Sequence, residues 1–130
     1  MGVAHHAAYI PWLELGRTEL LRTTGVTYAQ LESTGVFLVV TRLEISYKAP
    51  ARYDDVIVIC TTVSGGSRAR IDHEYEVWRD LDDGRGKSDL LATAASTLAC
   101  VDQHGRPRAL PEWLVPPNRE PRRRAAERRI

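Results

Sequence analysis

Apolar residues recur at helical spacing over one long stretch of the chain, from Ala7 to Thr24. Pro11 fits a helix only in its first turn, so this helix is predicted to begin near His6 or Ala7, with Gly25 closing it. The apolar stripe is wider than that of an ordinary surface helix, which predicts burial on several sides. Its members are Ile10, Trp12, Leu13, Leu15, Leu20 and Leu21.

A β-pattern follows a short second helix, which is predicted from Thr27, a suitable N-cap, to about Glu32. Ser64-Gly65-Gly66 is interpreted as the turn of a hairpin. One apolar helix followed by four long antiparallel strands predicts an α+β domain in which a curled sheet wraps a central helix. The strands are indicated by alternation or by β-branched runs, at Val36–Tyr47, Val56–Val63, Ser67–Arg79 and Leu90–Val101.

Composition indicates one ordinary globular domain, because the 130 residues are 43% hydrophobic and 27% charged with a formal net charge of +1. Six arginines lie within residues 118–130, which are interpreted as a disordered tail behind a domain of residues 1–117. Contact of this tail with nucleic acid or CoA phosphates is the alternative. Cys60 and Cys100 lie in apolar, strand-like runs, so a disulfide framework is not expected. No apolar run is long enough to span a bilayer, and we expect a cytoplasmic protein without a nucleic-acid partner.

The segment Met1–Arg22 resembles the signature of the 4-hydroxybenzoyl-CoA thioesterase family, especially its Tol-Pal-associated acyl-CoA thioesterase branch. In that branch D-x-x-G-V-V-x-H-x-x-Y precedes a helix with E-x-x-R-T-E. Tyr47-Lys48-Ala49-Pro50-Ala51 resembles the family's Y-x-x-P-A, and Leu110-Pro111 its closing L-P. The resemblance covers roughly residues 1–114. The matching positions in the first segment are Gly2, Val3, His6, Tyr9, Glu14, Arg17, Thr18 and Glu19.

The resemblance implies the hotdog fold and hydrolysis of an acyl-CoA thioester without a cofactor, in a homodimer or homotetramer whose active sites lie between protomers. It also implies that the main-chain N–H of His6 receives the oxyanion, which agrees with the donors and dipole at a helix N-terminus. The side chains of His5 and His6 have a plainer alternative as solvent-facing imidazoles. A metal site is disfavoured because adjacent residues point in different directions and no further ligand cluster has suitable spacing.

The catalytic carboxylate of the family lies three positions before the matched glycine, which in this chain would precede Met1. We therefore expect a longer natural product with an aspartate and the first strand upstream, with a true truncation as the alternative. A second branch of hotdog thioesterases carries a catalytic glutamate on this helix with a threonine one turn later, and Glu14 and Thr18 reproduce that spacing. The alternative for Glu14 is a helix-face carboxylate tied to Arg17 or Thr18. His6 and Glu14 are about 12 Å apart along the helix, so joint action requires two protomers.

Substrate contacts are expected from the matched Gly2, Val3 and Tyr9. Lys48, Arg68 and Arg70 are candidates for the CoA phosphates, with plain surface charge as the alternative. His73 and Tyr75 lie on the apolar face of their strand and are interpreted as packed core groups. The rival function is a non-catalytic hotdog module that binds CoA or a protein partner.

Overall fold

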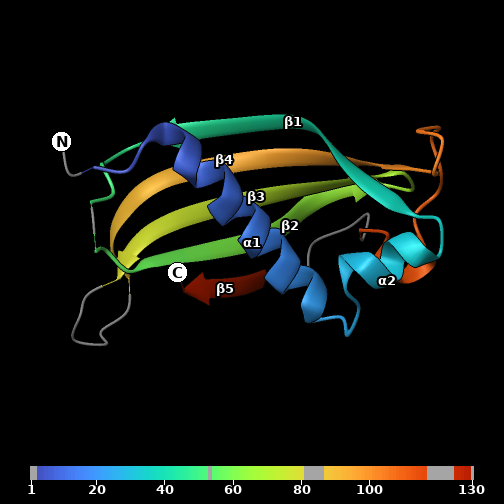
Figure 1. Cartoon of the computed structure of the whole chain (residues 1–130), viewed down its shortest axis with the longest axis horizontal. Coiled ribbons are helices and arrows are strands. Elements are labelled where there is room, and N and C mark those ends of the chain that lie inside the picture. The colour runs from blue at the N-terminus through green and yellow to red at the C-terminus, as the bar shows by residue number, and fades with distance from the viewer. Residues whose placement is uncertain (1–2, 53, 81–86, 117–124, 130) are drawn as a thin grey trace.

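An antiparallel sheet curls round one long helix in the computed structural model, which describes residues 3–52, 54–80, 87–116 and 125–129 (Figure 1). Within these ranges the sheet has five strands in the order β1-β4-β3-β2-β5. This arrangement confirms the predicted α+β class. The helices are η1 (His6–Ala8), α1 (Tyr9–Arg22), α2 (Tyr28–Ser33) and η2 (Glu112–Leu114), and the strands are β1 (Phe37–Tyr47), β2 (Ile57–Ser67), β3 (Arg70–Asp80), β4 (Lys87–Val101) and β5 (Ala125–Arg129).

Helix α1 crosses one face of the sheet and begins where the sequence predicted, because the 3₁₀ turn η1 starts at His6 and continues into it (Figure 1). Its buried side faces the sheet and consists of Tyr9, Leu13, Gly16, Leu20 and Leu21. The prediction that this helix is buried on several sides is wrong for a single chain, because Ile10 is 50% exposed and Leu15 is 40% exposed. Thr27 caps α2 as predicted, in a capping box with Gln30.

The predicted hairpin turn at Ser64-Gly65-Gly66 is wrong. Strand β2 continues through these residues to Ser67, which pairs with Arg70, so the turn consists of Arg68 and Ala69. The register shifts between Val63 and Gly65, which marks an irregularity in the strand. Gly66 has φ +149°, and a Cβ there would lie 2.2 Å from the carbonyl oxygen of Arg70. Glycine is therefore needed for a close backbone approach inside the ladder.

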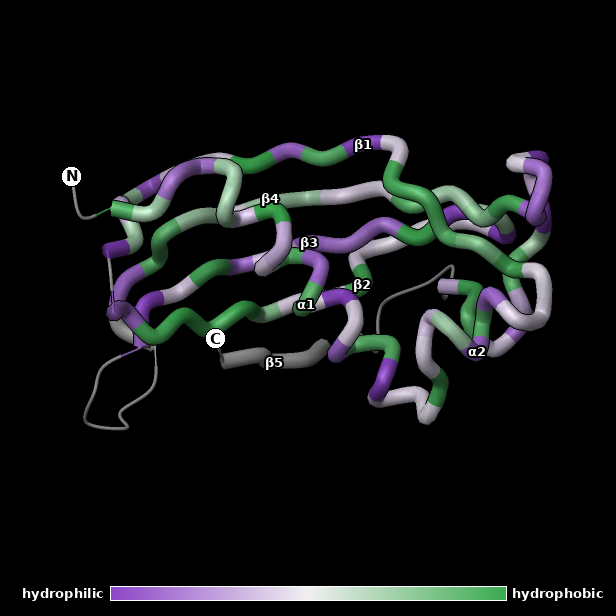
Figure 2. Tube along the Cα trace, viewed as in Figure 1, coloured by the Kyte–Doolittle hydropathy of each residue, from purple (hydrophilic) through white to green (hydrophobic). Residues whose placement is uncertain are grey.

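The core lies between the helices and the inner face of the sheet, and Figure 2 shows that β2 is apolar over its first half. The inward face predicted for β3 is confirmed, because Ile71, His73, Tyr75 and Val77 are all buried. Two clusters of buried residues form this core. One lies under α1 and includes Tyr9, Leu13, Ile59, Tyr75 and Leu91, and the other lies beside α2 and includes Leu31, Val36, Ile71, Cys100 and Leu110.

Part of the segment expected to be a disordered tail is a strand. Ala125–Arg129 form β5, which pairs antiparallel with β2 from Val58↔Arg129 to Thr62↔Ala125. The outer edge of β2 offers unpaired N–H and C=O groups, and this pairing satisfies them. The preceding arginine-rich residues 117–124 lie outside the described residues, as do residues 81–86 between β3 and β4. None of the helices in the described ranges has the length and apolar character needed to cross a membrane.

Candidate active site

The segment before α1 is fixed to the chain that follows β1. The N–H of Ala4 donates to the carbonyl oxygen of Ala51 at 2.7 Å, and Val3 forms an isolated antiparallel bridge with Arg52. Tyr9 is buried, and burial raises the pKa of its hydroxyl, which also makes a hydrogen bond with the backbone of Ala51. Residues 3–9 are therefore held in place by their contacts with Ala51 and Arg52.

The main-chain N–H of His6 is an open donor at the start of the helix. His5 uses its Nδ1 to accept the N–H of Ala7 at 3.2 Å, and its carbonyl oxygen accepts the N–H of Ala8 at 2.9 Å. Among the described residues the N–H of His6 has no acceptor. The carbonyl oxygen of His6 accepts the hydroxyl of Tyr47 at 3.1 Å, which ties this turn to β1. The donor identified from the sequence is thus exposed, held in place and available to a ligand.

Glu14 and Thr18 lie further along α1 and do not make the side-chain pair that their spacing suggests. The hydroxyl of Thr18 donates to the main-chain carbonyl oxygen of Glu14 at 2.9 Å. Within the described ranges the Glu14 carboxylate is bonded to neither Arg17 nor Thr18, and the Glu14 residue is exposed. The carboxylate is therefore available to solvent or to a ligand.

Arg17 of the matched motif points into the protein. Its Nη1 donates to the hydroxyl of Tyr75 at 3.2 Å, and that hydroxyl lies 2.5 Å from Oγ of Ser96. His73, on the same face of β3, has no hydrogen-bond partner for Nδ1 in the described structure. Burial, with the nearby positive charge of Arg17, lowers the pKa of His73 to about 4. This polar group fixes α1 to the sheet, and His73 and Tyr75 are core residues as predicted.

The three basic candidates for CoA phosphates lie at opposite ends of the sheet. Lys48 follows Tyr47 and is therefore at the His6 end, whereas Arg68 lies in the β2–β3 turn and Arg70 starts β3. Tyr47 pairs with Ala92 of β4 and Arg70 with Ala99, a separation of about 23 Å along a strand. Nε of Arg70 also lies 3.4 Å from Oδ1 of Asp72. One chain thus brings Val3, His6, Tyr9 and Lys48 together but not Arg68 and Arg70, while Gly2 lies outside the described residues.

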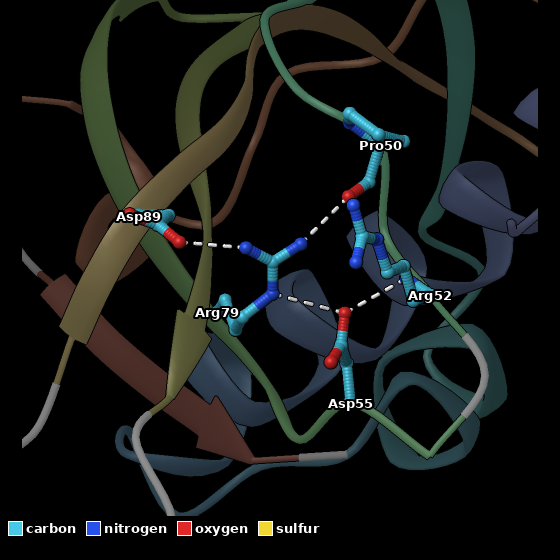
Figure 3. Close-up of polar contacts among 5 residues, drawn as sticks. All are labelled: Pro50, Arg52, Asp55, Arg79 and Asp89. Carbon is cyan, nitrogen blue, oxygen red and sulfur yellow. Dashed lines mark hydrogen bonds and ion pairs between the residues drawn. The ribbon is translucent and has the colours of Figure 1, made fainter.

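Figure 3 shows a cluster round Arg79 that the sequence did not indicate. The cluster lies at the His6 end of the sheet, because Arg79 pairs with Asp89 of β4, close to Ala92, the partner of Tyr47. Nε of Arg79 donates to Oδ2 of Asp55 at 3.0 Å, Nη1 to Oδ2 of Asp89 at 2.6 Å, and Nη2 to the carbonyl oxygen of Pro50 at 2.8 Å. Oδ2 of Asp55 also accepts the N–H of Arg52 at 2.7 Å. The hydrogen bond from the main chain of Arg52, and after it the one from Arg79, lowers the pKa of Asp55. The hydrogen bond with Asp55 raises the pKa of Arg79.

Comparison with known proteins identifies the family. A sequence model described as the thioesterase-like superfamily matches residues 1–117. The acyl-CoA thioester hydrolase YbgC of Escherichia coli O6:H1 is 31% identical over 115 residues, which cover 88% of this chain and 81% of that protein. The DHNA-CoA thioesterase of Staphylococcus aureus has a similar structure, with a TM-score of 0.76, 29% identity, and coverage of 88% of this chain and 73% of that one. A 4-hydroxybenzoyl-CoA thioesterase, at a TM-score of 0.74 with 20% identity and coverage of 85% and 82%, shows the shared hotdog fold.

Proposed function

Because this chain belongs to the thioesterase-like superfamily, we propose that it uses the main-chain N–H of His6 to stabilise the oxyanion formed during thioester hydrolysis. The chain is an acyl-CoA thioester hydrolase, as the predicted family and fold imply. The observation that carries the oxyanion proposal is the open N–H donor at the first turn of a helix that is tied down on both sides, by Tyr47 and by Ala51.

The chemistry requires this donor because attack on a thioester carbonyl moves negative charge onto its oxygen. A fixed N–H about 3 Å from that oxygen stabilises the charge without reorganising at the moment of reaction. The positive end of the α1 dipole acts in the same direction. The exposed imidazole of His6 takes no part in this step, so the role belongs to the backbone.

Glu14 is the proposed general base that activates water, with Thr18 as its neighbour on the same helix face. The open Glu14 carboxylate supports this role. Its separation of about 12 Å from His6 along the helix means that the two groups meet one substrate only if they come from different protomers. A homodimer is therefore part of the proposal.

Exposed apolar side chains support this dimer. Ile10 and Leu15 are exposed on α1, and Val39 and Val40 are exposed on β1, an edge strand that pairs with β4. Burial of such groups against a second copy would remove apolar surface and a free strand edge from water. A dimer could also supply Arg68 and Arg70 to a CoA molecule whose acyl end lies near Val3, His6 and Tyr9 of the other protomer.

A cytoplasmic location stays a prediction from the sequence.

Release of CoA-SH tests the proposed function. The protein is mixed with a panel of short, long and aromatic acyl-CoA thioesters and a thiol-trapping dye, and dye formation is followed with time. We expect enzyme-dependent release from at least one thioester. Binding of CoA without release from any member of the panel would contradict hydrolysis and favour the non-catalytic binding module.

A further inference from the structure

Arg79 connects three parts of the chain close to the His6 segment, namely β3, β4 and the connection between β1 and β2. The residue lies near the end of β3 and bonds to Asp89 of β4, to Asp55 before β2 and to the carbonyl oxygen of Pro50 after β1 (Figure 3). Its side chain is 23% exposed, so the guanidinium is partly withdrawn from water. A planar guanidinium can hold several acceptors in fixed directions, which a lysine ammonium cannot do in the same way.

Two acceptors of Arg79, Pro50 and Asp55, lie before and after Ala51 and Arg52 in the sequence, and these two residues contact the His6 segment. Ala51 and Arg52 follow Pro50 directly, and Asp55 accepts the N–H of Arg52. Ala51 is 1% exposed, and its carbonyl oxygen receives the N–H of Ala4. A continuous series of contacts therefore runs from Arg79 through Pro50, Asp55, Arg52 and Ala51 to residues 3–9.

We propose that Arg79 is a positioning residue, which holds Pro50, Arg52 and Asp55 in place so that the N–H of His6 stays aimed at the substrate carbonyl. This proposal rests on the oxyanion role given to His6 above. Arg79 touches neither substrate nor reacting atoms in this scheme. An oxyanion donor must keep its place within about 0.5 Å, and a displacement of about 1 Å can lower the rate by roughly 100-fold. Loss of Arg79 would leave two carboxylates and a carbonyl without this partner. Ala51 and Arg52, which contact the His6 segment, could then shift.

The first test measures the coupling without any activity. Amide hydrogen exchange of Ala4, whose N–H is bonded to Ala51, is compared in the parent protein, Arg79→Ala and Arg42→Ala. Arg42 is the matched control, because its guanidinium pairs with the exposed Glu44 on β1. We expect the protection of Ala4 to fall by about tenfold or more in Arg79→Ala and to stay at the parent level in Arg42→Ala. Equal protection of Ala4 in all three folded proteins would overturn the proposal.

The second test is kinetic. Arg79→Ala is expected to lower kcat by about tenfold or more with less than about a threefold change in KM, and added guanidinium ion should restore part of kcat. Arg79→Lys should fall between the parent and Arg79→Ala. If Arg79→Ala does not fold, Asp89→Ala removes only the 57% exposed partner and should shift Ala4 exchange and kcat in the same direction. An unchanged kcat in a folded variant would overturn the proposal, whereas absence of CoA-SH release by the parent would instead refute the proposed function.

Discussion

Gly16 of α1 lies directly against Thr61 of β2. A Cβ at Gly16 would stand 2.3 Å from Oγ1 of Thr61 and 2.9 Å from Cγ2 of Ile59. Thr61 is completely buried, so its side chain has no room to move aside. This contact sets how closely α1 approaches the sheet, and α1 carries His6 at its start.

Gly16→Ala is therefore expected to destabilise the protein. In an ordinary helix this change would stabilise by about 1 kcal/mol, but the overlap with Thr61 should cost about 1–3 kcal/mol, which leaves a net destabilisation of up to about 2 kcal/mol. Thermal unfolding followed by circular dichroism should show a lower Tm. Thr61→Ala removes the Oγ1 atom that the new methyl group would meet. In the Thr61→Ala background, Gly16→Ala should therefore lower the Tm by less than it does in the parent. A Tm above that of the parent for Gly16→Ala would contradict the contact.

His73 should make stability depend on pH in the acid range. Its pKa is lowered from 6.5 to about 4 in the folded protein, by burial first and by the charge of Arg17 second. The unfolded chain therefore binds a proton more readily, and the free energy of unfolding should decrease as pH falls from about 6.5 to about 4, by roughly 3 kcal/mol for this residue. Urea unfolding of the parent and of His73→Leu at several pH values measures the difference. Parallel pH curves for the two proteins would reject the assignment.

The Glu14→Gln variant distinguishes a catalytic role of the Glu14 carboxylate from a structural one. If the carboxylate activates water, the variant should keep its Tm within the range of ordinary surface changes and lose about 10²-fold or more in kcat. Glu32→Gln is the control, because Glu32 is an exposed carboxylate on α2. An unchanged kcat with a lower Tm would assign Glu14 to the helix surface instead.

The dimer is tested by sedimentation velocity at micromolar protein concentration. We expect a species of at least two protomers, because the exposed Ile10, Leu15, Val39 and Val40 and the free edge of β1 favour association. Ile10→Glu should shift the distribution toward monomer and lower kcat together, since the proposed site takes groups from two chains. A monomeric parent with full activity would contradict a shared site.

Local periodicity was enough to predict α1 and the inward face of β3, and the N-cap residue Thr27 indicated the start of α2. Helical and strand spacing depend on neighbouring residues, and the faces carrying Leu13 and Tyr75 could be identified from spacing alone. The Ser64-Gly65-Gly66 segment misled because glycine serves both turns and close backbone approaches inside a strand. Only the partner strand decides between them.

Long-range contacts account for what the sequence did not reveal. The composition of residues 118–130 suggested disorder, but the free edge of β2 pairs with Ala125–Arg129, and that edge is a property of the folded sheet. The Arg79 cluster joins β3 to Pro50 and Asp55 of the β1–β2 connection and to Asp89 of β4. Glu14 and Thr18 lie one helix turn apart, as their spacing predicts, but the Thr18 hydroxyl bonds to the backbone, a choice that spacing does not determine.

The most direct test of the oxyanion proposal compares His6→Ala with His6→Pro. His5 has φ −64° and ψ 144°, an extended conformation that suits the residue before a proline, and His6 is the first residue of the 3₁₀ turn, so proline removes the N–H with little strain. The kcat for CoA-SH release, measured on folded variants, should stay near the parent value in His6→Ala and fall by about 100-fold or more in His6→Pro. Equal losses in the two variants, or full activity in His6→Pro, would contradict a main-chain oxyanion donor at this position.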